Sequence, residues 1–299
     1  MKVHHFAFGI LIGIIWGSNF VVAKVAVEHI PPIFFTALRF SLLAILLLPW
    51  LRIQRKVMPQ ILVIAVVGGA IHFALIILGL AYSGEVAPIA IAAQLNVPFA
   101  AILSVVFLGE VLGFWRALGV GAAFGGVMIL GYDPAVFEYK FALLLVAASA
   151  FVQAVSFVLM RKVEGVGVFE MQGWMAVISA VCLLAVTGLF EQNQMAGLIT
   201  AGWVGAGAIL YNAIAVSLIG HGGMYFLIQR YPVTRVAPLW LMAPVWGAVG
   251  GVVYFGDTLT VLMIIGGLVT LGGVWAITMG QVKDESRATN EAEATSEVL

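Results

Sequence analysis

Two histidines inside long apolar stretches are the residues of this sequence with the clearest capacity for chemistry. His72 lies in VGGAIHFALIILGLAYS and His221 in SLIGHGGMYFLIQRYPV, and a tyrosine follows each by ten positions. An imidazole changes its charge near neutral pH and can bind a carboxylate. Ionisable groups in apolar segments usually face a cavity or a partner. Two interpretations stay open: polar groups that line a pathway, or neutral imidazoles hydrogen-bonded to a neighbouring helix.

A second set of polar side chains is spaced for a single helix face. Trp16 and Asn19 lie three positions apart, as do Gln153 and Ser156, and the two pairs are related by an offset of 137 positions. Residues at this spacing share one side of a helix. Aromatic and amide groups on an inward face suit an amphipathic small molecule, whereas hydrogen bonds between helices are the alternative.

A polar stripe accompanies His221. Ser217, His221, Tyr225 and Gln229 follow one another at every fourth position, so they share a helix face. Because such a face is too polar for lipid, we expect it to line a pathway or to contact protein.

Two prolines mark possible hinges. Pro98 follows Gln94 and Asn96, and Pro244 follows Trp240. A proline inside a helix removes a backbone hydrogen bond and bends the helix, which is tolerated beside a cavity or a neighbour that satisfies the freed carbonyl. Pro98 and Pro244 are therefore candidate hinges or simple kinks, and Gln94, Asn96 and Trp240 are further candidates for the pathway.

Motifs for catalysis and metal binding do not occur. The sequence holds no HExxH pair, no GxSxG elbow and no paired aspartates in its apolar runs, and Phe255-Gly256-Asp257 lacks the first glycine of GxGD. We expect no enzyme, no cofactor and no bound metal. A receptor or scaffold is a further class, but no sizeable extramembrane domain is present. Acidic residues fall at or near the ends of apolar runs, which leaves passive flux or coupling through a histidine open.

The composition determines which elements must position these residues. Of the 299 residues, 63% are hydrophobic and only 9% are charged, which indicates a membrane-spanning chain. A net charge of zero gives no reason to expect a nucleic-acid partner. With about 20 apolar residues per span, the sequence predicts ten helices, at about 5–27, 32–51, 60–82, 86–108, 113–131, 139–160, 168–189, 203–229, 234–255 and 259–280.

An internal repeat organises these helices. The stretch 105–127 matches 252–274 at an offset of 147, with Gly109, Gly119 and Gly126 meeting glycines and Glu110 meeting Asp257. Five helices per half put the two halves into the membrane in opposite senses, and inverted repeats of this kind place a substrate site between the halves. We expect an all-α polytopic membrane protein with two inverted five-helix repeats around a central cavity. The halves are 1–131 and 132–280, and the polar segment 281–299 is predicted to be a disordered cytoplasmic tail.

The distribution of basic residues predicts the orientation. With the N-terminus inside, eleven of the fourteen Lys and Arg residues fall on the cytoplasmic side, which follows the positive-inside rule and places both termini in the cytoplasm. They are Lys2, Arg52, Arg55, Lys56, Arg116, Arg161, Lys162, Arg230, Arg235, Lys283 and Arg287. Lys24 and Arg39 then lie near the outer face, where they extend to the interface or attract an anionic carboxylate.

Glycines at every fourth position allow close helix packing. Gly9, Gly13 and Gly17 form one such run, and the pairs Gly121/Gly125 and Gly247/Gly251 form two more. We expect contacts inside one chain rather than a dimer seam, and a functional monomer.

Several of these residues carry a resemblance to a known family. Trp16-Gly17-Ser18-Asn19-Phe20 with Lys24, Arg39, and Pro98 ahead of Leu108-Gly109-Glu110 resemble EamA-type members of the drug/metabolite transporter superfamily, and Pro244 with Phe255-Gly256-Asp257 repeats the pattern. The chain is most similar to YddG-like amino-acid exporters of bacterial inner membranes, although it has Asp257 where glutamate is usual.

The resemblance implies a multi-pass inner-membrane transporter in the lipid bilayer that exports amino acids, aromatic or hydrophobic ones among them, or similar small metabolites. A carrier of nucleotide sugars or sugar phosphates is the alternative within the superfamily, and it would need basic residues to meet phosphate. An intramembrane enzyme is the alternative from another class.

Overall fold

The computed structural model describes residues 1–298 except 232–235 and 237–238, and every regular element in this part of the chain is helical. Nine of its helices are long and apolar enough to cross a membrane, and a shorter apolar helix covers Met242–Phe255. Together they match the ten expected spans, although the start of the ninth span (234–255) falls partly outside the described residues.

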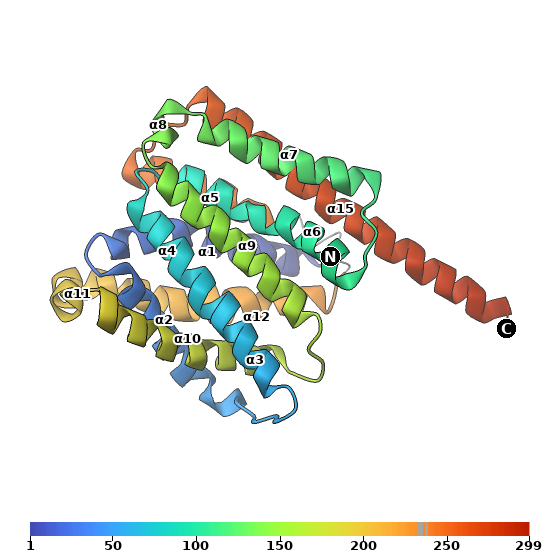
Figure 1. The fold of residues 1–299 in the computed structure, drawn as a ribbon, viewed down its shortest axis with the longest axis horizontal. Helices are drawn as coiled ribbons and strands as arrows, with labels where there is room; N and C mark the ends of the chain where they lie inside the picture. Colours follow the sequence, from blue (N-terminus) through green and yellow to red (C-terminus); the bar gives the residue numbers. More distant parts are fainter. Residues whose placement is uncertain (232–235, 237–238, 299) are drawn as a thin grey trace.

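The first half of the chain contains five of these helices, joined by short connections (Figure 1). They are α1 (Val3–Val27), α2 (Pro32–Leu47) with a short turn η1 (Leu48–Trp50), α3 (Met58–Ile64) running through η2 (Ala65–Ile71) into α4 (His72–Tyr82), α5 (Ala87–Ala92) with η3 (Ala93–Leu95) and α6 (Asn96–Leu108), and α7 (Phe114–Gly131).

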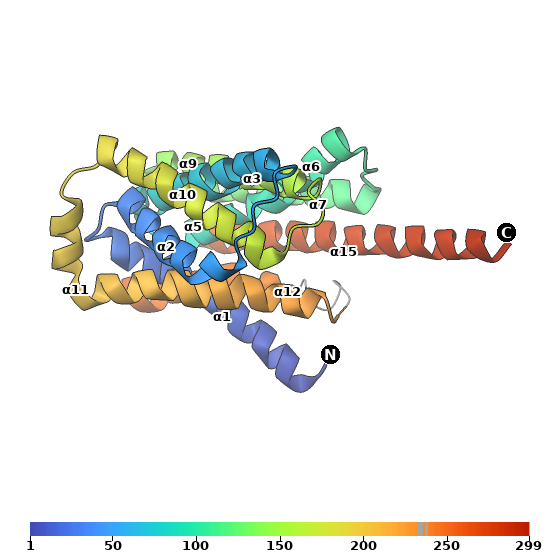
Figure 2. The same cartoon turned by 90° about the horizontal axis from the view of Figure 1, so that it is seen from below.

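A short helix, α8 (Pro134–Phe137), leads into the second half. Its elements are α9 (Lys140–Met160), α10 (Val168–Phe190), α11 (Gln194–Leu210) with η4 (Tyr211–His221) and α12 (Gly222–Ile228), α14 (Met242–Gly250) with η5 (Gly251–Phe255), and α15 (Val261–Val298). The eighth expected span begins earlier than predicted. Helix α11 starts at Gln194 and bends at Gly202 (φ 51°) before the chain enters the bundle (Figure 2).

Within the described residues, three of the spans contain wide π-helical turns. The first, η2, ends immediately before His72, the second, η4, ends at His221, and the third, η5, ends at Phe255. Turns of this kind are rare and occur frequently at functional sites. Of the two histidines that the sequence pairs, His72 directly follows a π-helical turn and His221 is the last residue of one.

Each candidate hinge proline is the third residue of a helix that follows an interruption. Pro98 stands in the first turn of α6, directly after the 3-10 turn η3, and Pro244 stands in the first turn of α14, after a turn at Leu241. Proline has no N–H for the carbonyl four positions earlier, which belongs to Gln94 in one case and to Trp240 in the other. The predicted breaks are present, and a hinge motion at them stays a prediction.

Helices α7 and α15 form a close seam between the two halves and lie side by side in both views (Figures 1 and 2). A Cβ atom on Gly119 would lie 2.7 Å from the carbonyl oxygen of Gly273, and one on Gly126 would lie 2.5 Å from that of Gly266. Since later residues of α7 meet earlier residues of α15, the helices are antiparallel. In the sequence repeat, with its offset of 147, Gly119 corresponds to Gly266 and Gly126 corresponds to Gly273. The repeat therefore relates one glycine pair to the other.

Further contacts between the halves are also antiparallel or related by the sequence repeat. Helix α2 packs against α10, with Ile33 near Glu191 and Leu47 near Gly173, so this pair is also antiparallel. Helix α1 packs on α14, and the corresponding pair in the sequence repeat, α9 with α6, is also in contact.

The glycine runs are used in two ways. Gly13 and Gly17 pack against Leu239, Met242 and Ala243, so the first run makes contacts within the chain as predicted. A Cβ on Gly121 or Gly125 would meet no atom within 4 Å. The expectation of packing within the chain is wrong for this pair, because the opposite face of α7 carries Gly119 and Gly126 into the seam with α15.

The C-terminal segment also differs from expectation. We predicted disorder from residue 281 onward, but α15 continues to Val298 and extends beyond the bundle (Figure 1). The segment contains four glutamates and three alanines and no proline. Glutamate and alanine have high helix propensity, which favours continuation of the helix through this segment.

Candidate functional site

Trp16 and His221 lie together at the centre of the polar stripe. Their rings are 5.3 Å apart with an angle of 45° between the planes, and the indole N–H of Trp16 donates to the carbonyl of Val216 at 3.3 Å. The sequence named both residues but did not predict that they touch. His221 is exposed in spite of this contact, so an imidazole and an indole present one mixed polar and aromatic surface.

His72, the counterpart of His221 in the repeat, is differently bonded. Its Nδ1 lies 2.7 Å from the Ser149 hydroxyl and 3.0 Å from the Ser149 carbonyl, and that hydroxyl lies 3.0 Å from the His72 carbonyl. These bonds join α4 to α9. Of the two interpretations above, the contacts of His72 fit an imidazole bonded to a neighbouring helix.

Arg39 is the functional candidate that the sequence reasoning misplaced. It is only 5% exposed, in the middle of α2, and its guanidinium donates from Nη1 to Asn212 Oδ1 at 3.0 Å and from Nη2 to Ser217 Oγ at 3.2 Å. The rings of Phe73 and Phe40 lie 4.5 and 5.1 Å from its central carbon. The prediction that Arg39 extends to the outer interface is wrong, because polar groups of η4 hold it inside the bundle.

Lys24 also has partners inside the protein. Its ammonium group donates to the carbonyls of Leu80 at 3.1 Å and Ser83 at 2.6 Å, at the end of α4. A cation at a helix C-terminus satisfies carbonyls that have no partner in the helix. Lys24 therefore joins α1 to α4, and this contact replaces the predicted extension to the interface.

Several predicted site residues have buried polar atoms with no hydrogen-bond partner among the described residues. They are the side-chain oxygens of Asn19, Asn96, Gln153 and Ser156 and the indole nitrogen of Trp240. Most buried polar groups in proteins are paired, so a group of unpaired ones requires an explanation. Ser156 faces Gly68 of η2, and Trp240 packs against the buried cluster of Ile12, Met224, Leu227 and Val236.

The remaining candidates are less closely associated. Tyr225 lies in α12 and is 42% exposed, and Gln94 lies half-buried in η3. Two surface hollows of about 410 and 430 Å³, one between α14 and α15 and one between α1 and α12, contain none of the predicted site residues. The central cavity and the assignment of these residues to it stay predictions.

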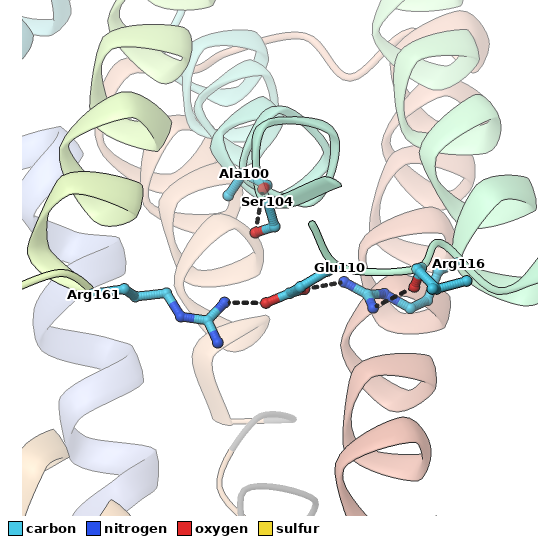
Figure 3. Close-up of polar contacts among 6 residues, drawn as sticks. Ala100, Ser104, Glu110, Arg116 and Arg161 are labelled. Carbon is cyan, nitrogen blue, oxygen red and sulfur yellow. Dashed lines mark hydrogen bonds and ion pairs between the residues drawn. The ribbon is translucent and has the colours of Figure 1, made fainter. Parts of the chain in front are cut away.

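Glu110 connects the halves at one end of the bundle. It follows Gly109, whose φ of 69° ends α6, and its carboxylate accepts from Arg161 at 2.5 Å and from Arg116 at 3.3 Å. Figure 3 shows the carboxylate between the two arginines, which come from the end of α9 and from α7. We call this the Glu110 end.

Asp257, the counterpart of Glu110, holds the opposite end. It follows Gly256, which has a φ of 72°, and its Oδ2 accepts from the backbone N–H groups of Val86 at 2.8 Å and Ala87 at 3.1 Å, at the start of α5. The positions that correspond to Val86 and Ala87 at an offset of 147, residues 233 and 234, lie outside the described residues. We call this the Asp257 end.

A second carboxylate reinforces the Asp257 end. Glu85 accepts from the Thr258 hydroxyl at 3.0 Å and from the Tyr139 hydroxyl at 2.9 Å. Burial and the bond to Glu85 raise the pKa of Tyr139 above its usual range, so the phenol stays a donor. The Thr260 hydroxyl also donates to Asp133. The acidic side chains at this end therefore bind three connections of the chain together.

Comparison with known proteins gives a consistent result. The model of the EamA-like transporter family matches residues 6–132 and again 140–279. Two curated relatives described as a probable amino-acid metabolite efflux pump cover 93% of their own length and 91% of this chain. The one from Salmonella typhimurium is 26% identical over 283 residues, and the one from Escherichia coli K12 is 24% identical over 279 residues.

A further relative is also described as a transporter, and a solved structure shares the fold. An uncharacterized transporter from Archaeoglobus fulgidus is 25% identical over 268 residues, covering 86% of this chain and 92% of its own. One solved structure, described only as a crystal structure of a protein, shares the fold with a TM-score of 0.56 at 19% identity, over 93% of this chain and 98% of the other. With its apolar helices and two matches to one transporter model, the chain is a multi-pass membrane protein that belongs to the EamA-like transporter family.

Proposed function

We propose that this protein exports amino acids, including aromatic and hydrophobic ones, or similar small metabolites across a bacterial inner membrane. The observation that carries the proposal is the cluster around η4, where Trp16 and His221 make an aromatic surface and Arg39 supplies a buried cation. Such a site suits a molecule with an apolar side chain and one anionic group. The names of the Salmonella and Escherichia relatives support the same substrate class.

The proposed mechanism is alternating access between two five-helix halves of opposite orientation, 1–131 and 132–280. Three observations support an inverted repeat: the two family matches, the antiparallel pairs α7/α15 and α2/α10, and glycine contacts that exchange at an offset of 147. In such proteins the substrate site lies between the repeats. The Glu110 end then faces the cytoplasm with both termini, and the Asp257 end faces outward.

The charge inside the bundle favours an amino acid over a phosphate-bearing substrate. A nucleotide sugar carries two negative charges or more and would require several cations. Among the described residues around η4, Arg39 is the cation that lies there, and Lys24 is engaged by the carbonyls at the end of α4. One guanidinium matches one carboxylate.

Flux into liposomes that contain only this protein tests the proposal. We expect concentration-driven flux of phenylalanine or leucine and none of a nucleotide sugar. Substrate accumulation driven by a pH gradient would show proton coupling, and its loss on replacing both histidines would assign the coupling to them. Flux of nucleotide sugars alone, or of nothing, would contradict the exporter assignment. Labelling of single cysteines at Glu110 and Asp257, in a chain with Cys182→Ser, is expected to modify them from opposite sides of the membrane.

A further inference from the structure

The guanidinium of Arg39 is a buried charge that forms no ion pair with an acidic side chain of the described residues. Its two hydrogen-bond acceptors, Asn212 and Ser217, are neutral, the rings of Phe40 and Phe73 lie beside it, and its Nε has no partner in the same part of the chain. The buried acidic side chains of the described residues, Asp133, Glu170 and Asp257, lie at helix ends. An unpaired charge inside a membrane protein is costly, and such groups usually mark a binding site or an ion pathway.

The guanidinium still has donors to offer. An arginine has five N–H groups in a planar fork that matches both oxygens of a carboxylate. The bonds to Asn212 and Ser217 use one N–H on each terminal nitrogen. The buried Nε–H has no partner among the described residues, so it is a donor that an anion could use while the bonds to Asn212 and Ser217 persist.

The surroundings place Arg39 beside the other candidate groups. Its partner Ser217 adjoins Val216, which accepts from Trp16, and stands one turn from His221. The Ser217 carbonyl also accepts from Gln172 of α10 at 2.8 Å, and the buried side-chain oxygen of Gln172 has no partner in the described part of the chain. Arg39 thus meets η4 from the α2 side and Trp16 meets it from the α1 side, at the junction of the two halves.

We propose that Arg39 binds the carboxylate of the transported molecule, and that Trp16 and His221 contact the apolar remainder. The inference rests on the exporter function proposed above and adds a rule to it. A substrate must carry a carboxylate, so an amino acid is moved and its uncharged-carboxamide analogue is not. In the absence of substrate, Asn212 and Ser217 hold the guanidinium in place, which prepares it for the anion.

The test compares phenylalanine with phenylalaninamide in liposomes that contain the full chain. The two compounds share a side chain and an ammonium group and differ in the carboxylate. We expect the unaltered protein to move phenylalanine at least tenfold faster. Arg39→Gln is expected to remove this preference by lowering phenylalanine flux at least tenfold while amide flux stays within twofold. Arg39→Lys keeps the charge but loses the planar fork, so it retains part of the preference.

The control is Arg116→Gln, which removes another buried arginine, one that has a carboxylate partner at the Glu110 end. It is expected to leave the ratio of the two fluxes unchanged. If Arg39→Gln lowers both fluxes equally, Arg39 has only a structural role and the inference is overturned. If Arg39→Gln does not fold, the ratio in the unaltered protein and in Arg39→Lys decides.

The same assay separates this inference from the exporter assignment. Equal flux of amino acid and amide through the unaltered protein would overturn carboxylate recognition and leave the export of amines and amino acids standing. No flux of any amino acid would overturn both. Quenching of tryptophan fluorescence on titration with phenylalanine, reduced at least tenfold in apparent affinity by Arg39→Gln, supplies an independent binding measurement, because Trp16 lies beside the site.

Discussion

Glu110 accepts a hydrogen bond from Arg161 at 2.5 Å, and this contact joins the connection after α6 to the end of α9 in the other half of the chain (Figure 3). Arg161 is 49% exposed at its side chain, so solvent screens the pair. Exposed ion pairs contribute about 1 kcal/mol or less. The contact therefore determines how the two halves meet at this end more than it determines total stability.

The first prediction concerns this pair. We expect a double-mutant cycle of Glu110→Gln and Arg161→Gln, measured by thermal unfolding in detergent, to give a coupling energy of about 1 kcal/mol or less. Transport is expected to change more than stability, because the contact joins the two halves at one end of the bundle. A coupling energy several times larger would show that the pair is shielded from solvent.

The second prediction concerns the glycine seam. Gly126→Ala and Gly273→Ala are each expected to destabilise the fold by about 1–3 kcal/mol, because the added methyl group meets backbone atoms of the facing helix. The adjacent Gly125→Ala and Gly272→Ala are matched controls, since an added Cβ meets nothing within 4 Å. They are expected to be neutral or slightly stabilising through helix propensity. Equal loss of thermal stability in both sets would mean that the seam is not closely packed.

The third prediction concerns the cap that Asp257 makes on α5. Asp257→Asn removes the charge from a carboxylate that is 7% exposed and holds two backbone N–H groups, with an expected loss of about 1–3 kcal/mol. A methyl group on Gly251 would displace the same carboxylate. Gly251→Ala and Asp257→Asn should therefore be strongly non-additive in thermal unfolding, whereas additive losses would separate the two sites.

The fourth prediction distinguishes the two repeat-related histidines. His72→Gln is expected to lower stability by about 1–2 kcal/mol, and Ser149→Ala should have a similar effect that does not add to it, because the two residues share their hydrogen bonds. His221→Gln is expected to leave thermal stability nearly unchanged, since the residue is exposed, and to lower amino-acid flux severalfold. The reverse pattern would exchange the structural and functional roles.

Sequence reasoning was most successful where the repeat constrains the backbone. Gly109 and Gly256 were aligned from the sequence, and both adopt left-handed backbone conformations that end a helix before an acidic residue. Glycine adopts this conformation with the least strain, so the preference for it is visible in the sequence. The spans were predictable for a similar reason, because the thickness of a bilayer fixes their length.

The faces of the helices were harder to predict. Lipid and protein interior are equally apolar, so an apolar helix does not reveal which side is buried. Arg39 illustrates the problem, because its position in the sequence suggested the outer interface, and only Asn212 and Ser217 of the other half show why it is buried. The Trp16–His221 contact was missed for the same reason, because the two helices are far apart in the sequence. The hydrogen bond from Trp16 to Val216, which joins the same helices, connects residues 200 positions apart.

The seam between α7 and α15 has one more consequence. The sequence repeat relates the contact of Gly119 with Gly273 to the contact of Gly126 with Gly266. The surface of α7 that meets α15 therefore resembles the surface of α15 that meets α7. Under the inverted-repeat arrangement proposed above, a single half inserted into the bilayer in both directions would carry the surface needed to pair with itself. Two such halves would need only a covalent tether to stay together.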